Sequence, residues 1–148
     1  MKETILKIEH MNISFTQYTQ GMRQIELPVI RNLDVEVKEG EMVAIVGSSG
    51  SGKSLLAHAV MGILPYNASM GGIMAYRGEL LTERRIRQLR GKEIVMVPQS
   101  ISYLDPLTKV GAQITKGKKD TESRKKLRDI LNRYHLEQSV EDKYPFEL

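Results

Sequence analysis

Residues 29–37 alternate, with Val29, Arg31, Leu33, Val35 and Val37 on one side, which is the pattern of a strand. Residues 5–15 and 29–37 are rich in β-branched and other apolar side chains, and each stretch predicts a strand. Gly40 then precedes residues 42–46 (Met-Val-Ala-Ile-Val), which are apolar at every position. An unbroken apolar run of this length suits a strand that is covered on both faces, as parallel strands in α/β proteins are. The chain is therefore predicted to begin with two strands, followed by a third that is covered on both faces.

A helical pattern begins directly after the glycine-rich residues 47–52. We expect a helix over residues 54–64 that Pro65 closes, and a short hairpin over residues 73–78. A second, basic helix is expected over residues 82–90. Strand, loop and helix in this order are the building unit of α/β folds.

Residues 93–97 (Glu-Ile-Val-Met-Val) form a second short apolar run, and Pro98 ends it because proline lacks the donor that a sheet ladder needs. This run predicts another buried strand. From Val110 onward the pattern is helical and polar. Four residues recur there at i, i+3, i+4 and i+7 on one helix face: Leu127, Ile130, Leu131 and Tyr134. The sequence thus favours an α/β core followed by a helical region.

The glycine-rich residues carry a motif with a chemical purpose. They match G-x-x-x-x-G-K-[ST] with Gly47, Ser48, Ser49, Gly50, Ser51, Gly52, Lys53 and Ser54. Glycines let backbone N–H groups approach phosphate oxygens, Lys53 can reach the β and γ phosphates of ATP, and Ser54 can place its hydroxyl on Mg²⁺. The helix that continues with Leu55 turns its positive dipole end toward the anion. A flexible Ser/Gly linker is the alternative, but a linker would not be bracketed by a buried strand and an apolar helix.

Composition restricts the class of protein. Hydrophobic residues make up 41% and charged residues 27% of the 148 residues, as in soluble globular domains. The chain has no cysteine, which excludes disulfides and thiolate metal sites, and its three histidines lie far apart in the sequence. No apolar run is long enough to span a bilayer and no signal-peptide pattern is present, so we expect membrane association only through a partner.

The net charge of +4 comes mainly from basic runs at residues 84–90 and 116–126. Such runs are usually solvated faces of helices. A nucleic-acid or acidic-lipid footprint is the alternative, but no aromatic residues are interleaved with the bases to stack on nucleotides. We therefore expect no nucleic-acid partner.

The motif at residues 47–54 resembles the Walker A motif of ABC transporter ATP-binding subunits more than that of other phosphate-loop proteins. Gln99, just after the run at residues 93–97, stands where these ATPases carry their Q-loop glutamine. By resemblance, its amide oxygen touches Mg²⁺ or the attacking water, and the loop behind it contacts the permease subunit. A surface glutamine that follows a strand is the alternative.

Four further segments resemble the oligopeptide, dipeptide and nickel importers of this family: residues 90–94 (Arg-Gly-Lys-Glu-Ile), 103–106 (Tyr-Leu-Asp-Pro), 110–114 (Val-Gly-Ala-Gln-Ile) and 144–148 (Tyr-Pro-Phe-Glu-Leu). That subfamily usually has Phe before the Q-loop glutamine, whereas this chain has Pro98, so the transported substrate stays open. The family also stacks adenine on an upstream aromatic residue, which is Phe15 by position, with Tyr18 second. Packing in the core is the alternative role for Phe15.

The resemblance implies an α/β fold of the P-loop NTPase type. Residues 1–99 would form the N-terminal part of the ABC nucleotide-binding core, and residues 100–148 the start of its helical subdomain. In the family a Leu-Ser-Gly-Gly signature follows, whose first residue would be Leu148, so the core is expected to be incomplete. No apolar run of the chain ends in the Asp-Glu pair that supplies the Walker B aspartate and the catalytic base. Apolar strand edges are therefore expected to be uncovered.

Together these residues predict an ATP-binding subunit of an ABC importer. By resemblance, the subunit is expected to be cytoplasmic, to lie on the inner face of the membrane through permease subunits, and to pair with a second ATP-binding subunit. Lys53 and Gln99 are the expected catalytic residues, and Ser54 and Gln99 the expected Mg²⁺ ligands. By itself the chain is expected to bind ATP with little or no hydrolysis. A nucleotide-binding module without turnover is the alternative; a DNA-associated ABC ATPase is a third possibility, which the segments at residues 90–114 disfavour.

Overall fold

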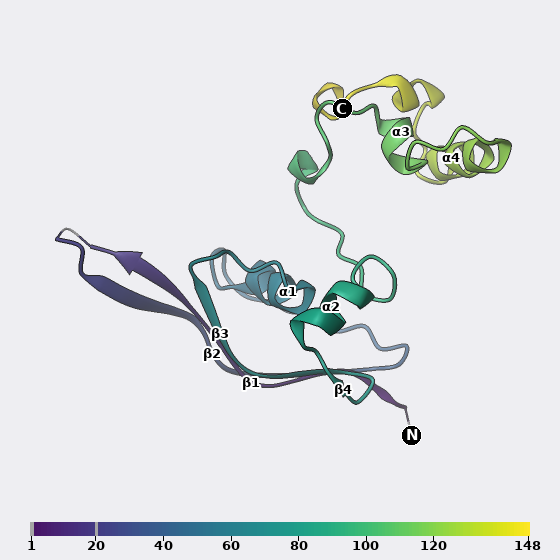
Figure 1. The fold of residues 1–148 in the computed structure, drawn as a ribbon. Coiled ribbons are helices and arrows are strands. Elements are labelled where there is room, and N and C mark those ends of the chain that lie inside the picture. The colour runs from purple at the N-terminus through teal and green to yellow at the C-terminus, as the bar shows by residue number, and fades with distance from the viewer. Residues whose placement is uncertain (1, 20) are drawn as a thin grey trace. The chain divides into compact units, whose positions relative to one another are not determined.

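The computed structural model describes residues 2–19 and 21–148, apart from the side chain of Ile101. It divides into two compact units, Met1–Met96 and Val97–Leu148, shown in Figure 1. Each unit has a hydrophobic core of its own. A search of the described residues finds no helix with the length and apolar character that a membrane span requires.

A four-stranded antiparallel sheet with the order β2-β1-β3-β4 is the frame of the first unit. Its strands are β1 (Thr4–Tyr18), β2 (Gln24–Lys38), β3 (Ala68–Tyr76) and β4 (Glu79–Leu80). β1 pairs with both β2 and β3. The strands predicted over residues 5–15 and 29–37 are confirmed as β1 and β2, and the hairpin predicted near residues 73–78 is confirmed as β3 and β4.

An irregularity interrupts β1 where its pairing with both neighbours shifts register. His10 has a φ of 52° there, and its N–H group donates to Asp34 Oδ1 at 2.6 Å. On β3, Gly72 has a φ of 103°, and a Cβ atom added to it would lie 2.7 Å from the carbonyl oxygens of both Glu9 and His10. Glycine is therefore required at position 72, because the two backbones approach too closely for any side chain.

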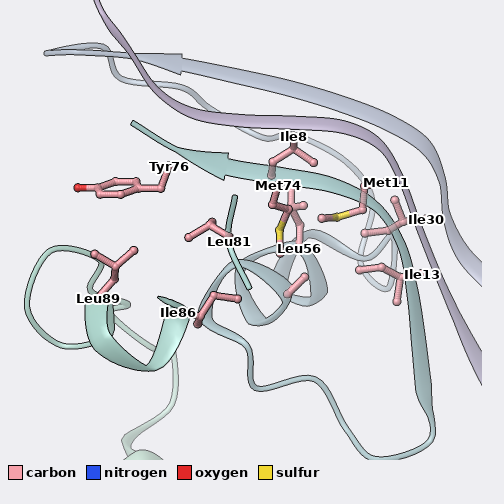
Figure 2. Packing of buried hydrophobic residues seen from close by; sticks show 11 residues of the cluster. Ile8, Met11, Ile13, Ile30, Leu56, Met74, Tyr76, Leu81, Ile86 and Leu89 are labelled. Atoms are coloured by element: carbon pink, nitrogen blue, oxygen red, sulfur yellow. The ribbon is translucent and has the colours of Figure 1, made fainter. Parts of the chain in front are cut away.

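Two helices of the first unit, α1 (Lys53–Met61) and α2 (Glu83–Leu89), pack with the sheet around one core (Figure 2). The buried residues come from the three longer strands, both helices and the segment before α2: Ile8, Met11, Ile13, Ile30, Leu56, Ala59, Met74, Tyr76, Leu81, Ile86 and Leu89. The two helices predicted over residues 54–64 and 82–90 are thus confirmed, although α1 ends earlier, at Gly62 with a φ of 61°. The Thr82 hydroxyl caps α2 by accepting from the N–H of Arg85 at 3.3 Å.

The prediction of buried strands at residues 42–46 and 93–97 is wrong. Neither run is a strand, and their only pairing among the described residues is a single bridge between Arg90 and Ile94. Met42 is 97% exposed and Val97 is 92% exposed. A strand that is apolar on both faces needs a neighbour at its edge for its backbone groups and layers on both faces for its side chains. The antiparallel sheet of the first unit supplies neither to these two runs.

Side chains of both runs nevertheless line one apolar groove of about 220 Å³ next to α1. Val43 and Ile45 come from the first run, and Ile94 and Met96 from the second. Leu56 of α1 lies at the same groove. One side of each run therefore contributes to the packing of the first unit, while the other side is bare.

The second unit is helical, as the sequence predicted. Its elements are a 3₁₀ turn η1 (Ile101–Tyr103), α3 (Val110–Ile114), α4 (Thr121–Arg133), and two further 3₁₀ turns, η2 (Gln138–Asp142) and η3 (Pro145–Glu147). Its core consists of Val110, Leu127, Leu131 and Val140. Of the predicted apolar face, Leu127 and Leu131 are buried, but Tyr134 is 66% exposed because α4 ends before it.

Candidate functional site

Residues 47–52 form the loop that leads into α1. Gly50 has a φ of 80° and Gly52 a φ of 92°, in the left-handed region that favours glycine. The N–H of Ser51 donates to the carbonyl oxygen of Ser48 at 3.3 Å, which curls the loop. Gly52 is the N-cap residue of α1 and provides no side chain to bond the first turn. These two positions of the motif therefore use the conformational freedom of glycine.

The loop lies directly against the sheet. A Cβ atom added to Gly52 would lie 3.1 Å from side-chain carbons of both Val29 and Ile30 on β2. At the other end of the loop, a Cβ atom on Gly47 would lie 2.7 Å from Ser51 Oγ. Strand β2 therefore positions the loop from outside, and the absence of side chains on these glycines lets its two ends close together.

Lys53, the first residue of α1, points its ammonium group back into this loop. Its Nζ atom donates to the carbonyl oxygens of Ser48 at 2.6 Å and Gly47 at 2.8 Å, and to Ser51 Oγ at 3.3 Å. The side chain is half-buried and forms no ion pair with the described acidic residues. The loop thus holds one positive charge that no carboxylate neutralises.

Several backbone donors of the same loop are unused. Within the described part of the chain, the N–H groups of Gly50 and of residues 52–55 have no hydrogen-bond partner, since the first bond of the helix runs from the N–H of Leu56 to the Gly52 carbonyl oxygen. The hydroxyl of Ser54 is exposed and likewise forms no hydrogen bond with the described residues. A bound phosphate group needs hydrogen-bond donors, which the free N–H groups at the start of the helix and the lysine ammonium provide. A Mg²⁺ ion bound with the phosphate needs an oxygen ligand, which the free hydroxyl provides.

The two candidates for adenine stacking lie on β1. Phe15 is half-buried and pairs with Leu27 of β2 and Ala68 of β3. Tyr18 is exposed and lines a hollow of about 430 Å³ together with Tyr66. The stacking role of either residue stays a prediction.

Gln99 is exposed and belongs to the second unit. The strand that was expected to lead into it is not formed. No group of three or more histidine, aspartate or glutamate side chains gathers as a metal site in residues 2–19 and 21–148. The roles of Gln99 and Ser54 toward Mg²⁺ stay predictions.

Sequence reasoning missed a hydrogen-bonded clamp that follows Gln99. The N–H of Asp105 donates to Gln113 Oε1 at 3.0 Å, and Gln113 Nε2 donates to the carbonyl oxygens of Asp105 at 2.9 Å and Thr108 at 2.7 Å. The Thr108 hydroxyl and the N–H of Leu107 both donate to the Asp105 carboxylate, and these bonds hold the pKa of Asp105 below its usual range. In the sequence, the segments at residues 103–106 and 110–114 show a family resemblance but no sign that they bond to each other.

Comparison with known proteins gives a consistent result over most of the chain. Residues 30–147 match the family model described as ABC transporter. The probable D,D-dipeptide transport ATP-binding protein DdpD of Escherichia coli K12 is 30% identical over 162 residues, which cover 100% of this chain and 48% of DdpD. The oligopeptide transport ATP-binding protein AmiE of Streptococcus pneumoniae is 34% identical over 160 residues, which cover 99% of this chain and 44% of AmiE. The chain thus spans less than half the length of these relatives.

A solved structure shares the fold. A bacterial Atm1-family ABC exporter, solved with ATP bound, aligns with 99% of this chain and 25% of its own length, with a TM-score of 0.52 at 20% sequence identity. Together with the family match, this likeness supports an α/β core of the P-loop type, even though the strands that form here are antiparallel.

Proposed function

The chain belongs to the ABC transporter family, and we propose on this premise that it is the nucleotide-binding part of an ATP-binding subunit of a peptide importer. The observation that carries the proposal is the loop at residues 47–54, where an unneutralised ammonium group and unbonded N–H groups are held together. That arrangement favours binding of a polyanion, and the polyanion that this motif binds is a nucleoside triphosphate.

In this proposal each loop residue has a defined task. The N–H groups of Gly50 and of residues 52–55 donate to phosphate oxygens, and the first turn of α1 adds its dipole. Lys53 has three donors on a flexible stem, so it can exchange a carbonyl oxygen of its own loop for a phosphate oxygen. Phe15 is proposed to stack on adenine, with Tyr18 as the alternative.

Mg²⁺ would supply the charge neutralisation that the triphosphate needs. Ser54 is proposed as one ligand because its hydroxyl is exposed and free of other bonds among the described residues. Gln99 is proposed as a second ligand on the strength of its sequence position alone.

We further propose that this chain by itself turns over ATP slowly or not at all. No apolar run in its sequence ends in the Asp-Glu pair that would supply a general base. A nucleotide-binding module without turnover is therefore the second candidate function.

The relatives support proposals about the cargo and the partners. The names of DdpD and AmiE refer to transport of D,D-dipeptides and oligopeptides, so a peptide is the proposed cargo. Nickel is the alternative, supported by the resemblance of short segments and by a 31% identical relative over 115 residues, the metal-staphylopine import system ATP-binding protein CntD of Staphylococcus aureus. A permease is proposed to dock on the region after Gln99, where Tyr103 and Leu107 are exposed. A second ATP-binding subunit would complete the pair, and the permease would hold both at the cytoplasmic face of the membrane.

The experiment that tests the proposal measures ATP affinity and phosphate release on the same preparations. The chain is compared with Lys53→Ala and with a matched control, Lys92→Ala, which removes an exposed lysine of the same unit. We expect Lys53→Ala to weaken ATP binding by about a hundredfold, Lys92→Ala to leave it unchanged, and no variant to release phosphate. Absence of ATP binding in the unaltered chain would refute the site, and turnover above background would refute the proposed lack of hydrolysis.

A further inference from the structure

Five basic side chains of the second unit converge on one hollow of about 420 Å³. They come from three separate segments, namely the residue before α3, the loop between α3 and α4, and α4 itself: Lys109, Lys118, Lys119, Arg124 and Arg128. The acidic side chains at the same hollow are Glu141 and Asp142. Five positive and two negative groups leave a formal charge of +3 around this space.

Most of these bases form no ion pair, although Lys118 lies near enough to Asp120 for its charge to help lower the pKa of that carboxyl. Lys109 pairs with Asp142 at 3.2 Å, but the other four form no ion pair with any described residue. Elsewhere in the chain exposed bases do find acids, as Arg85 does with Glu79 at 3.0 Å. Arg124 and Arg128 are also four residues apart on one helix, an arrangement of like charges that disfavours the helix unless an anion lies between them.

The walls of the hollow are fixed by packing. α3 lies so close to η2 that a Cβ atom on Gly111 would be 2.9 Å from the Glu141 carbonyl oxygen. The N–H of Val110 donates to the Lys143 carbonyl oxygen at 2.9 Å, which ties the start of α3 to the segment after η2. Leu127, buried between the two arginines in sequence, anchors α4 to the same core. The basic groups therefore surround a preformed concave surface.

We propose that this hollow binds a phosphate-bearing anion at a site separate from the loop at residues 47–54. Arginine guanidinium groups bind phosphate oxygens in a forked geometry, and lysines add mobile charges around them. A net charge of +3 and room for more than one phosphate group favour a ligand with several negative charges. Such a phosphate could belong to a free compound or to the headgroup of an anionic phospholipid, and the experiment separates the two sources.

The test uses the full chain with Lys53→Ala, so that the loop at residues 47–54 contributes little. Inorganic pyrophosphate is titrated into it by calorimetry, and binding to phosphatidylglycerol vesicles is measured by co-sedimentation. The test variant adds Arg124→Gln and Arg128→Gln. Its matched control adds Lys125→Gln and Arg133→Gln, which remove the same charge from α4 at residues that do not line the hollow.

We expect the test variant to lose about tenfold or more in affinity for one of the two probes, and the control to lose less than about twofold. Loss for pyrophosphate identifies a free ligand, and loss for the vesicles alone identifies a lipid headgroup. The proposal is overturned if neither probe binds, or if the control weakens binding as much as the test variant, because charge without a site then explains the result. Equal melting temperatures of the two variants verify that both are folded.

Discussion

The Nζ atom of Lys53 lies 2.6 Å from the carbonyl oxygen of Ser48, so the lysine is held by the backbone of the loop that it ends. A carbonyl oxygen carries only a partial charge, and the ammonium forms no ion pair with the described acids. An incoming phosphate therefore has no salt bridge to break. Replacing a carbonyl acceptor by an anionic one strengthens each hydrogen bond that the lysine makes.

The free hydroxyl of Ser54 leads to a prediction about Mg²⁺. If this hydroxyl holds the metal, Ser54→Ala should remove the gain in triphosphate affinity that Mg²⁺ provides, a loss of about tenfold, while affinity in EDTA stays unchanged. Ser49→Ala is the control, because Ser49 is an exposed serine of the same loop. Titration of ATP with and without Mg²⁺ measures the difference. Equal Mg²⁺ dependence in all three proteins would rule out Ser54 as a ligand.

The two left-handed glycines of the loop should respond differently to alanine. Gly50→Ala adds a methyl group with no atom within 4 Å, so it suffers only the backbone strain of a φ of 80°, about 1–2 kcal/mol. Gly52→Ala suffers a similar strain and also meets Val29 and Ile30 at 3.1 Å. We expect it to lower the free energy of unfolding by about 1 kcal/mol more than Gly50→Ala does. Urea unfolding followed by circular dichroism checks this, and equal losses would show that β2 does not position the loop.

Adjacent glycines on β3 provide a second matched pair. Gly72→Ala would place its Cβ 2.7 Å from two backbone carbonyl oxygens, which cannot move as a side chain can. We expect a loss of about 3 kcal/mol or more in the free energy of unfolding. Gly71→Ala meets no atom within 4 Å and should change stability by less than about 1 kcal/mol. If both variants melt alike, the close approach of β1 and β3 is not present in solution.

Local patterns predicted the antiparallel part of the fold and failed at the two apolar runs. β1 pairs with β2 on one side and with β3 on the other, so the β-prone residues 5–15 and the alternating residues 29–37 were sufficient to predict the first two strands. The run at residues 42–46 needs neighbours that the described residues do not provide, and periodicity carries no information about them. The loop was predictable because each motif position acts through its own backbone or side chain. Two features could not be predicted from the sequence: the close approach of Gly52 to Ile30, and the basic hollow of the second unit. Both depend on segments that are distant in sequence.

The second unit should lose stability at low pH. The N–H and hydroxyl of Ser123 donate to the carboxylate of Asp120, the N-cap residue of α4, and hold its pKa below the ordinary value of 3.8. A carboxyl whose pKa is lower in the folded state stabilises that state above its unfolded pKa, and this contribution disappears as pH falls through the folded pKa. Asp105 should also stabilise the folded state less as the pH falls, because hydrogen bonds from Thr108 and Leu107 lower its pKa.

We therefore expect the melting temperature of the second unit to be flat from about pH 7 to 5 and to fall below about pH 4. Asp120→Asn keeps an oxygen that can cap the helix but removes the titrating group, so its melting temperature should depend less on pH. Asp129→Asn, on the same helix, is the control. Thermal melts by circular dichroism between pH 3 and 7 give the comparison. A control that flattens the profile as much as Asp120→Asn would contradict the role of the cap.

The bare side of the run at residues 93–97 should drive self-association. Val95 is 68% exposed and Val97 is 92% exposed, and unpaired extended segments of this kind pair with other chains. Replacing both valines by lysine puts like charges on this surface, so association should decrease. Because Val95 is 68% exposed but also lines the groove next to α1, we expect only a small fall in the melting temperature. Leu107→Lys is the control, because Leu107 is 86% exposed but lies outside the run at residues 93–97. Sedimentation velocity over a range of concentrations decides: if the unaltered chain is monomeric throughout, or if Leu107→Lys disperses it equally, the exposed run is not the surface through which copies associate.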